Sequence, residues 1–181
     1  MPWKHDVVGK MRGLFEAVAI EPTNGIEDRD NKRSLAWRVF FEASTRLQGL
    51  LETQLKAGAN LSLSDYNILL MLYESPEQKM RMGELAERLG FIPSRLTYLV
   101  SGLIKEGWVD KRPSGTDRRG YEAVLTPSGI EATELASRIH QATVRELLLD
   151  ELTDAHIDQI VEAFEHLDLR TRDIQGGTSG A

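Results

Sequence analysis

Residues 107–126 of the chain read GWVDKRPSGTDRRGYEAVLT and contain the most informative secondary-structure pattern in the sequence. Residues 108–112 have the composition of a short β-strand, and residues 121–126 have that of a second one. The segment between them, 113–120, is polar and contains proline and glycine, as turns do. Two strands joined by such a turn predict a β-hairpin. No other stretch of the sequence gives a convincing strand pattern.

Two helices are expected directly before this hairpin. A short helix over about 83–89 is followed by a tight connection at 90–92. Pro93 suits the first turn of the second helix, because the amide that proline lacks would have had no partner there. The second helix runs to about residue 106, and Gly107 closes it. We expect its inward face to consist of Leu96, Leu99, Val100, Leu103 and Ile104.

A further helix is expected upstream of this pair. Ser62 and Asp65 have the spacing of a capping box, in which the serine oxygen accepts an unpaired amide and the acid reaches back. This helix ends at Ser75–Pro76. The order helix, helix, helix, hairpin over residues 62–125 predicts a winged helix-turn-helix, in a fold that is mainly α with a small β-hairpin wing.

Long helices are expected on both sides of this domain. One runs from Ser34, which can act as its N-cap, to about Ala57. Another begins at Thr126–Pro127, where a capping threonine precedes a proline, and extends to about Leu149. The last helix starts at Thr153 and carries apolar residues at helical spacing.

The two ends of the sequence differ from this pattern. Residues 1–33 form an N-terminal extension, which we expect to be an amphipathic helix followed by a charged linker. Three placements of this helix are open: packing on its own subunit, crossing to a dimer partner, or docking on another protein. Residues 173–181 are expected to be a flexible tail.

The winged helix-turn-helix has two groups of residues suited to DNA. The second helix of such a motif lies in the major groove with its N-terminal residues at the base edges. Here those residues are Ser94, Arg95, Thr97 and Tyr98. Arg118 and Arg119 at the hairpin tip suit the minor groove, whose negative potential attracts arginine, and Asp117 is expected to orient one of them. The alternatives are a solvated tip, a surface salt bridge for Arg95 and core packing for Tyr98.

Three motifs occur together in this region: the helix at 83–89, LIKEGWV at 103–109, and DRRG at 117–120 followed by VLTPSG at 124–129. Together they resemble the MarR family of bacterial transcription regulators, over about residues 34–170. The sequence departs from the family pattern at Ser101 and Gly102, where an acid and an arginine are frequent. It also departs at Tyr98, where many relatives have arginine, so the base preference does not carry over.

The resemblance implies an intertwined homodimer, with residues 34–61 and 126–172 as its helical dimerisation region. It also implies that Arg119 enters the minor groove and that Asp117 orients it. A further implication is a pocket for a small phenolic or aromatic effector. The candidate lining residues are Trp37, Phe41, Tyr66 and His140, and the alternative is that these side chains belong to the core.

The composition excludes several other classes of protein. The 181 residues contain no cysteine, which excludes thiolate catalysis and cysteine-ligated zinc or iron–sulfur sites. The four histidines form no metal-binding pair and no catalytic motif is recognisable, so we expect no metal, no cofactor and no enzymatic activity. No apolar run is long enough for a membrane helix, and residues 1–10 lack a signal-peptide core. We therefore expect a cytoplasmic protein with no membrane partner.

The distribution of charge along the sequence favours DNA binding more than the net charge does. The net charge is −6, but residues 76–125 hold nine basic and seven acidic side chains, so this segment is +2 and the rest is −8. We predict a regulator that binds a pseudo-palindromic operator in double-stranded DNA as a homodimer, acts as a repressor and is released by a small aromatic ligand. The alternatives are a winged-helix protein-interaction module without DNA binding, and a ligand-binding or enzymatic protein of unrelated class.

Overall fold

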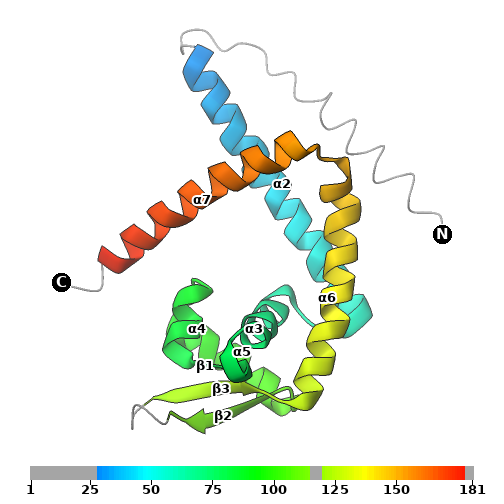
Figure 1. Cartoon of the computed structure of the whole chain (residues 1–181), viewed down its shortest axis with the longest axis vertical. Coiled ribbons are helices and arrows are strands. Elements are labelled where there is room, and N and C mark those ends of the chain that lie inside the picture. The colour runs from blue at the N-terminus through cyan, green and yellow to red at the C-terminus, as the bar shows by residue number, and fades with distance from the viewer. Residues whose placement is uncertain (1–27, 115–119, 178–181) are drawn as a thin grey trace. The chain divides into compact units, whose positions relative to one another are not determined.

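The computed structural model of the chain describes residues 28–114 and 120–177. Within these ranges the chain is mainly helical and has one small antiparallel sheet, as predicted. The chain divides into two compact units between Ala43 and Ser44. The second unit contains the end of the first described helix and every later element (Figure 1).

The first described helix, α2, spans Asp28–Ala59 and begins earlier than the predicted start at Ser34. The expectation of a linker was therefore wrong for residues 28–33. These residues include Lys32 and Arg33, and both residue types are good helix formers. Residues 1–27 of the predicted extension lie outside the described residues.

Helix α3 spans Leu63–Tyr73 and begins with the predicted capping box. The Asp65 amide donates to the Ser62 hydroxyl oxygen at 3.0 Å, and the Ser62 amide donates to the Asp65 carboxylate at 3.3 Å. The Leu63 amide donates to the Glu52 carboxylate of α2 at 2.6 Å, which attaches this helix start to α2. The buried side chains of α3 are Tyr66, Ile68, Leu69 and Leu72.

The helix-turn-helix pair consists of α4 (Met82–Arg88) and α5 (Pro93–Lys105). Gly90 has a φ of 63°, and the Phe91 amide donates to the Ala86 carbonyl at 2.9 Å. These are the features of a helix C-terminus closed by a left-handed glycine, which turns the chain sharply into α5. Gly107, with a φ of 76°, closes α5 in the same way, as predicted.

The sheet contains the predicted hairpin, β2 (Val109–Pro113) and β3 (Tyr121–Leu125), and a third strand, β1 (Lys79–Arg81). Strand β3 lies in the middle and is antiparallel to both neighbours, so Ala123 pairs with Met80 on one side and Lys111 on the other. A short 3-10 helix, η1 (Pro76–Gln78), precedes β1. Strand β1 was not predicted, because three residues with one apolar side chain show no local strand pattern and their partner strand is more than forty residues away.

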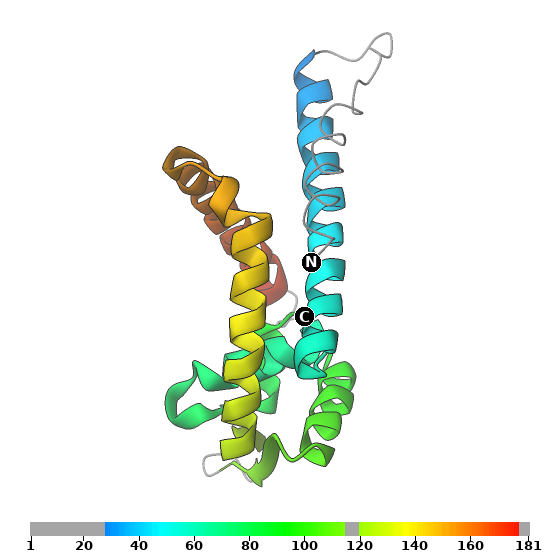
Figure 2. The same ribbon diagram turned by 90° about the vertical axis from the view of Figure 1, so that its right-hand side faces the viewer.

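Helix α6 (Pro127–Leu147) leads away from the hairpin as one continuous helix (Figure 2). Thr126 is its N-cap, as predicted, and accepts a hydrogen bond from the Gly129 amide at 3.0 Å. The hydroxyl groups of Thr126 and Ser128 also donate to the Gly107 carbonyl, at 2.7 and 2.9 Å. The start of α6 is thus fixed to the turn between α5 and β2.

The chain ends in η2 (Leu149–Glu151) and α7 (Asp154–Gly177). Residues 173–177 of the predicted tail belong to α7, and residues 178–181 lie outside the described residues. The side chains of α7 are exposed from Asp154 to Thr171. Six apolar residues are among them: Ile157, Ile160, Val161, Phe164, Leu167 and Leu169.

The core of the second unit lies where α3, α4 and α5 cover the sheet. Leu85 of α4, Leu96 of α5 and Ala123 of β3 are each at most 1% exposed. The predicted inward face of α5 is confirmed at Leu96, Val100 and Leu103, but Ile104 is 37% exposed. Leu103 takes the inward position in the last turn of α5, and the next residue lies about 100° further around the helix.

Candidate nucleic-acid interface

Helix α5 presents polar residues outward because its apolar residues anchor the opposite face. Leu96, Val100 and Leu103 are each at most 2% exposed. The intervening positions near the N-terminus of the helix are free of the core and face solvent. They are the four residues predicted for base contacts: Ser94, Arg95, Thr97 and Tyr98.

Arg95 is held in place by two neighbours. Its guanidinium lies over the ring of Phe91, with the central carbon 4.4 Å from the ring centroid. Its Nη2 also donates to the hydroxyl of Ser64, at the start of α3, at 3.4 Å. Phe91 in turn packs against the core. The direction of Arg95 is thus set by the turn before α5 and by α3, while the residue stays exposed.

Tyr98 and Thr97 differ in how they are held. Tyr98 is 80% exposed, so packing within the single chain does not account for its position. The Thr97 hydroxyl donates to the Pro93 carbonyl at 2.9 Å, and the Ser101 hydroxyl donates to the Thr97 carbonyl at 2.7 Å. A hydroxyl held in this way keeps lone pairs that can accept from a partner.

The hairpin carries basic side chains on its strands. Lys111 of β2 lies over the ring of Tyr121 of β3, with its Nζ 4.3 Å from the ring centroid. Arg112 pairs with Asp110 at 3.0 Å. The Ser114 amide donates to the Gly120 carbonyl at 2.9 Å and closes the base of the tip. The predicted tip residues Asp117, Arg118 and Arg119 lie outside the described residues.

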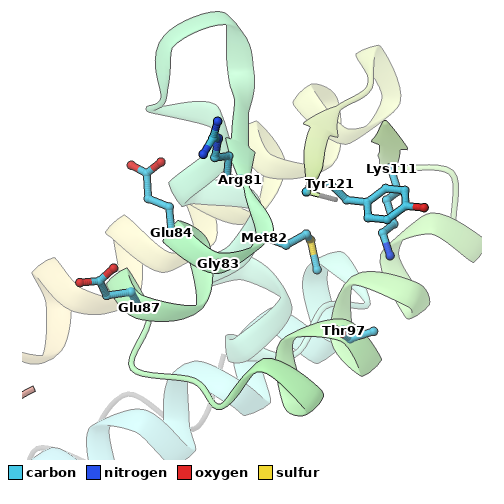
Figure 3. A pocket seen from close by; sticks show the side chains of 9 residues that line it. Arg81, Met82, Gly83, Glu84, Glu87, Thr97, Lys111 and Tyr121 are labelled. Atoms are coloured by element: carbon cyan, nitrogen blue, oxygen red, sulfur yellow. The ribbon is translucent and has the colours of Figure 1, made fainter. Parts of the chain in front are cut away.

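A groove of about 630 Å³ adjoins the exposed face of α5. Figure 3 shows Arg81, Glu84 and Glu87 on one side of this groove and Lys111 beside the Tyr121 ring on the other. Thr97 links the groove to the candidate DNA-reading residues. The lining carries both signs of charge, and Glu84 is also paired with Arg88 at 2.8 Å.

The four candidate effector residues form two pairs in the structure. The Tyr66 and His140 rings lie 4.9 Å apart, and the Tyr66 hydroxyl donates to Ser137 at 3.4 Å. Tyr66 is 2% exposed, and burial lowers the pKa of His140. The other pair, Trp37 and Phe41, has ring centroids 5.8 Å apart, and both side chains are more than half exposed.

Two other kinds of feature, a metal-binding cluster and a membrane-spanning helix, were sought among the described residues. Within 28–114 and 120–177, no three His, Asp or Glu side chains are grouped to hold a metal ion. Over the same part of the chain, no helix is both long and apolar enough to cross a membrane.

Three residues of this surface were not predicted from the sequence. Phe91 and Ser64 hold Arg95, and Ile92, the residue before Pro93, is 67% exposed. The contacts of Phe91 and Ser64 depend on tertiary structure, since Ser64 and Arg95 lie on different helices. A signal for Ile92 was present, because an apolar residue stood where a helix N-cap normally has an oxygen-bearing side chain.

Comparisons of the sequence and of the structure with known proteins point to the same family. A family model described as "MarR family" matches residues 59–120. The chain is similar in structure to Sco3205, a MarR family transcriptional regulator from Streptomyces coelicolor solved in complex with DNA. The identity is 34%, the TM-score is 0.73, and the match covers 76% of this chain and 89% of that one.

Two relatives are similar in sequence. The transcriptional repressor YetL of Bacillus subtilis is 28% identical over 131 residues, which cover 71% of this chain and 78% of YetL. The exopolysaccharide II synthesis transcriptional activator ExpG of Rhizobium meliloti is 27% identical over 154 residues, which cover 76% of each chain.

Proposed function

The chain belongs to the MarR family of transcriptional regulators, and from this membership we propose that it binds a pseudo-palindromic operator in duplex DNA as a homodimer and represses transcription there. The observation that carries the proposal is the outward face at the N-terminal end of α5. In that position, Ser94, Arg95, Thr97 and Tyr98 meet the base edges of a major groove. Arginine donates two hydrogen bonds to guanine in such a groove.

The hairpin tip supplies the second contact in this proposal. Arg118 and Arg119 enter the minor groove, and Asp117 orients Arg119. This assignment rests on the sequence motif. It is supported by the hydrogen bond from the Ser114 amide to the Gly120 carbonyl, which holds the two strand ends on either side of the tip together.

The homodimer is supported by apolar side chains that are exposed on α7. Helix α7 exposes Ile157, Val161 and Phe164 on one side, since these positions recur at the spacing of one helical face. Contiguous exposed apolar surface of this kind marks an interaction site. We propose residues 34–61 and 126–172 as the dimerisation region and 62–125 as the DNA-binding domain.

A small aromatic effector is the last part of the proposal. Such a ligand lowers DNA affinity only if it binds one conformation better than the other. Tyr66 and His140, which lie together between α3 and α6, are the first residues to test. Trp37 and Phe41 remain candidates from the sequence.

The proposal is tested by selecting duplexes from a random pool with the full chain. We expect two related half-sites about one helical turn apart. In a salt titration, the logarithm of the binding constant should fall steeply with the logarithm of salt concentration. Arg95→Ala and Arg119→Ala should each weaken binding about tenfold or more. Arg33→Ala, which changes an exposed arginine of α2 outside the proposed dimerisation and DNA-binding regions, serves as the control and should bind like the parent.

The direction of regulation needs a separate measurement, because YetL is a repressor and ExpG an activator. A reporter gene behind the selected operator should be less active when the protein is present. Higher reporter activity would replace repression with activation and leave the DNA-binding part of the proposal intact. If no duplex is selected at low salt, DNA binding itself is refuted.

A further inference from the structure

Ile92 is one of the two most exposed large hydrophobic residues that the structure describes, at 67%, and the other is Tyr98. Both lie at the N-terminal end of α5. An exposed isoleucine buries little apolar surface in the folded chain, so packing does not explain why this residue is apolar.

Helix capping does not explain it either. Ile92 is the N-cap of α5, with extended backbone angles and no side-chain hydrogen bond to the helix. Serine, threonine, aspartate and asparagine are preferred at this position because their oxygen accepts one of the unpaired amides. The chain uses such caps at Ser62 and Thr126, whereas α5 begins at Ile92 and α4 at Arg81 without a side-chain cap. Ile92 is the apolar one of these two uncapped positions.

The position of Ile92 connects it with the residues proposed to read DNA. Arg95 follows three residues later and Tyr98 three residues after that, so Arg95 lies between Ile92 and Tyr98 on the helix surface. A ligand that meets Arg95 at the start of α5 therefore meets Ile92 as well.

The major groove offers one kind of apolar group at base edges, the C5-methyl of thymine. This inference rests on the function proposed above. We propose that Ile92 is a specificity-determining residue that packs against a thymine methyl group next to the base contacted by Arg95. Ile92 then adds a preference for thymine that the polar residues of α5 do not supply.

The experiment removes the methyl group alone. The operator selected with the full chain is resynthesised with deoxyuridine in place of thymidine, at one position at a time. Loss of one buried methyl contact should weaken binding about fourfold at one thymine of a half-site. At the other thymines, the change should have little effect.

The decisive variant is Ile92→Ser. Serine is a favourable N-cap, so this variant should melt at the same or a higher temperature than the parent. It should lose the discrimination between thymine and uracil at the one sensitive position while keeping the parent's salt dependence. Ile104→Ser, at the exposed end of the same helix, is the matched control and should keep that discrimination.

The outcomes separate this inference from the proposed function. If the parent binds its operator but no thymine is sensitive to methyl loss, Ile92 does not read a methyl group and only this inference is refuted. The same conclusion follows if Ile92→Ser keeps the parent's pattern of sensitivity. If the parent selects no duplex, the proposed function fails and this inference falls with it.

Discussion

The guanidinium of Arg95 lies over the ring of Phe91, with 4.4 Å between its central carbon and the ring centroid. The aromatic ring attracts the cation and restricts its plane. Because Phe91 belongs to the turn between α4 and α5, the arginine is arranged before any partner arrives. A side chain ordered in advance loses less conformational entropy on binding.

Phe91→Leu should therefore weaken operator binding about two- to fivefold, because this is the affinity change that corresponds to the free energy of an exposed cation–π contact. Leucine keeps an apolar side chain at this half-buried position, so the fold should be retained. Fluorescence anisotropy with labelled operator measures the effect. Phe91→Tyr keeps the ring and serves as the control; equal affinity of the Leu variant and the parent would show that the ring does not prepare Arg95.

Gly129→Ala should destabilise the chain by about 1–3 kcal/mol. A Cβ at this position would collide with the carbonyl oxygen of Trp108, a backbone atom that cannot rotate away. Gly102→Ala is the matched comparison, because a Cβ there meets nothing within 4 Å. That variant should gain about 1 kcal/mol from better helix propensity. Urea unfolding of both variants measures the two free energies, which should change in opposite directions.

Val161→Asp should dissociate the proposed homodimer, since it puts a charge on the apolar side of α7. We expect the dissociation constant to rise at least about tenfold. Gln159→Asp adds a carboxylate to the opposite side of the same helix and should leave the dimer intact. Sedimentation equilibrium of the parent and both variants tests this. A monomeric parent would contradict the dimer directly.

His140→Gln should reduce the loss of stability on acidification. Burial lowers the pKa of His140 below the ordinary histidine value of 6.5, so the unfolded chain takes up a proton more readily than the folded one. The free energy of unfolding of the parent therefore falls as the pH drops through about 6.5. The variant should lack this contribution, whereas carboxylate effects at lower pH are common to both. Urea midpoints between about pH 5 and pH 7.5 measure the difference; parallel curves would exclude His140 as the cause.

Local signals in the sequence were sufficient for most helix ends. The cap at Ser62, the proline at 93 and the closing glycine at 107 each act within one helical turn, and all three were predicted correctly. The hairpin was also predicted, because its two strands lie close together in the sequence.

Features that depend on residues far apart in the sequence could not be predicted from such local signals. Strand β1 forms because Lys79–Arg81 pairs with β3. The sequence of these three residues contains no signal that identifies their partner strand. The start of α2 was missed because charged residues suit both a linker and a helix. Within the candidate interface, the positions of Ser94, Arg95, Thr97 and Tyr98 followed from the order of elements. The support of Arg95 by Phe91 and Ser64 required the folded chain.

The carbonyl of Gly107 accepts hydrogen bonds from both Thr126 and Ser128, so the first turn of α6 is joined to the turn between α5 and β2. Helix α6 is therefore coupled directly to the helix that carries the proposed DNA-reading residues. In the proposed homodimer, we expect the angle between the two α6 helices to set the spacing of operator half-sites that the protein can span.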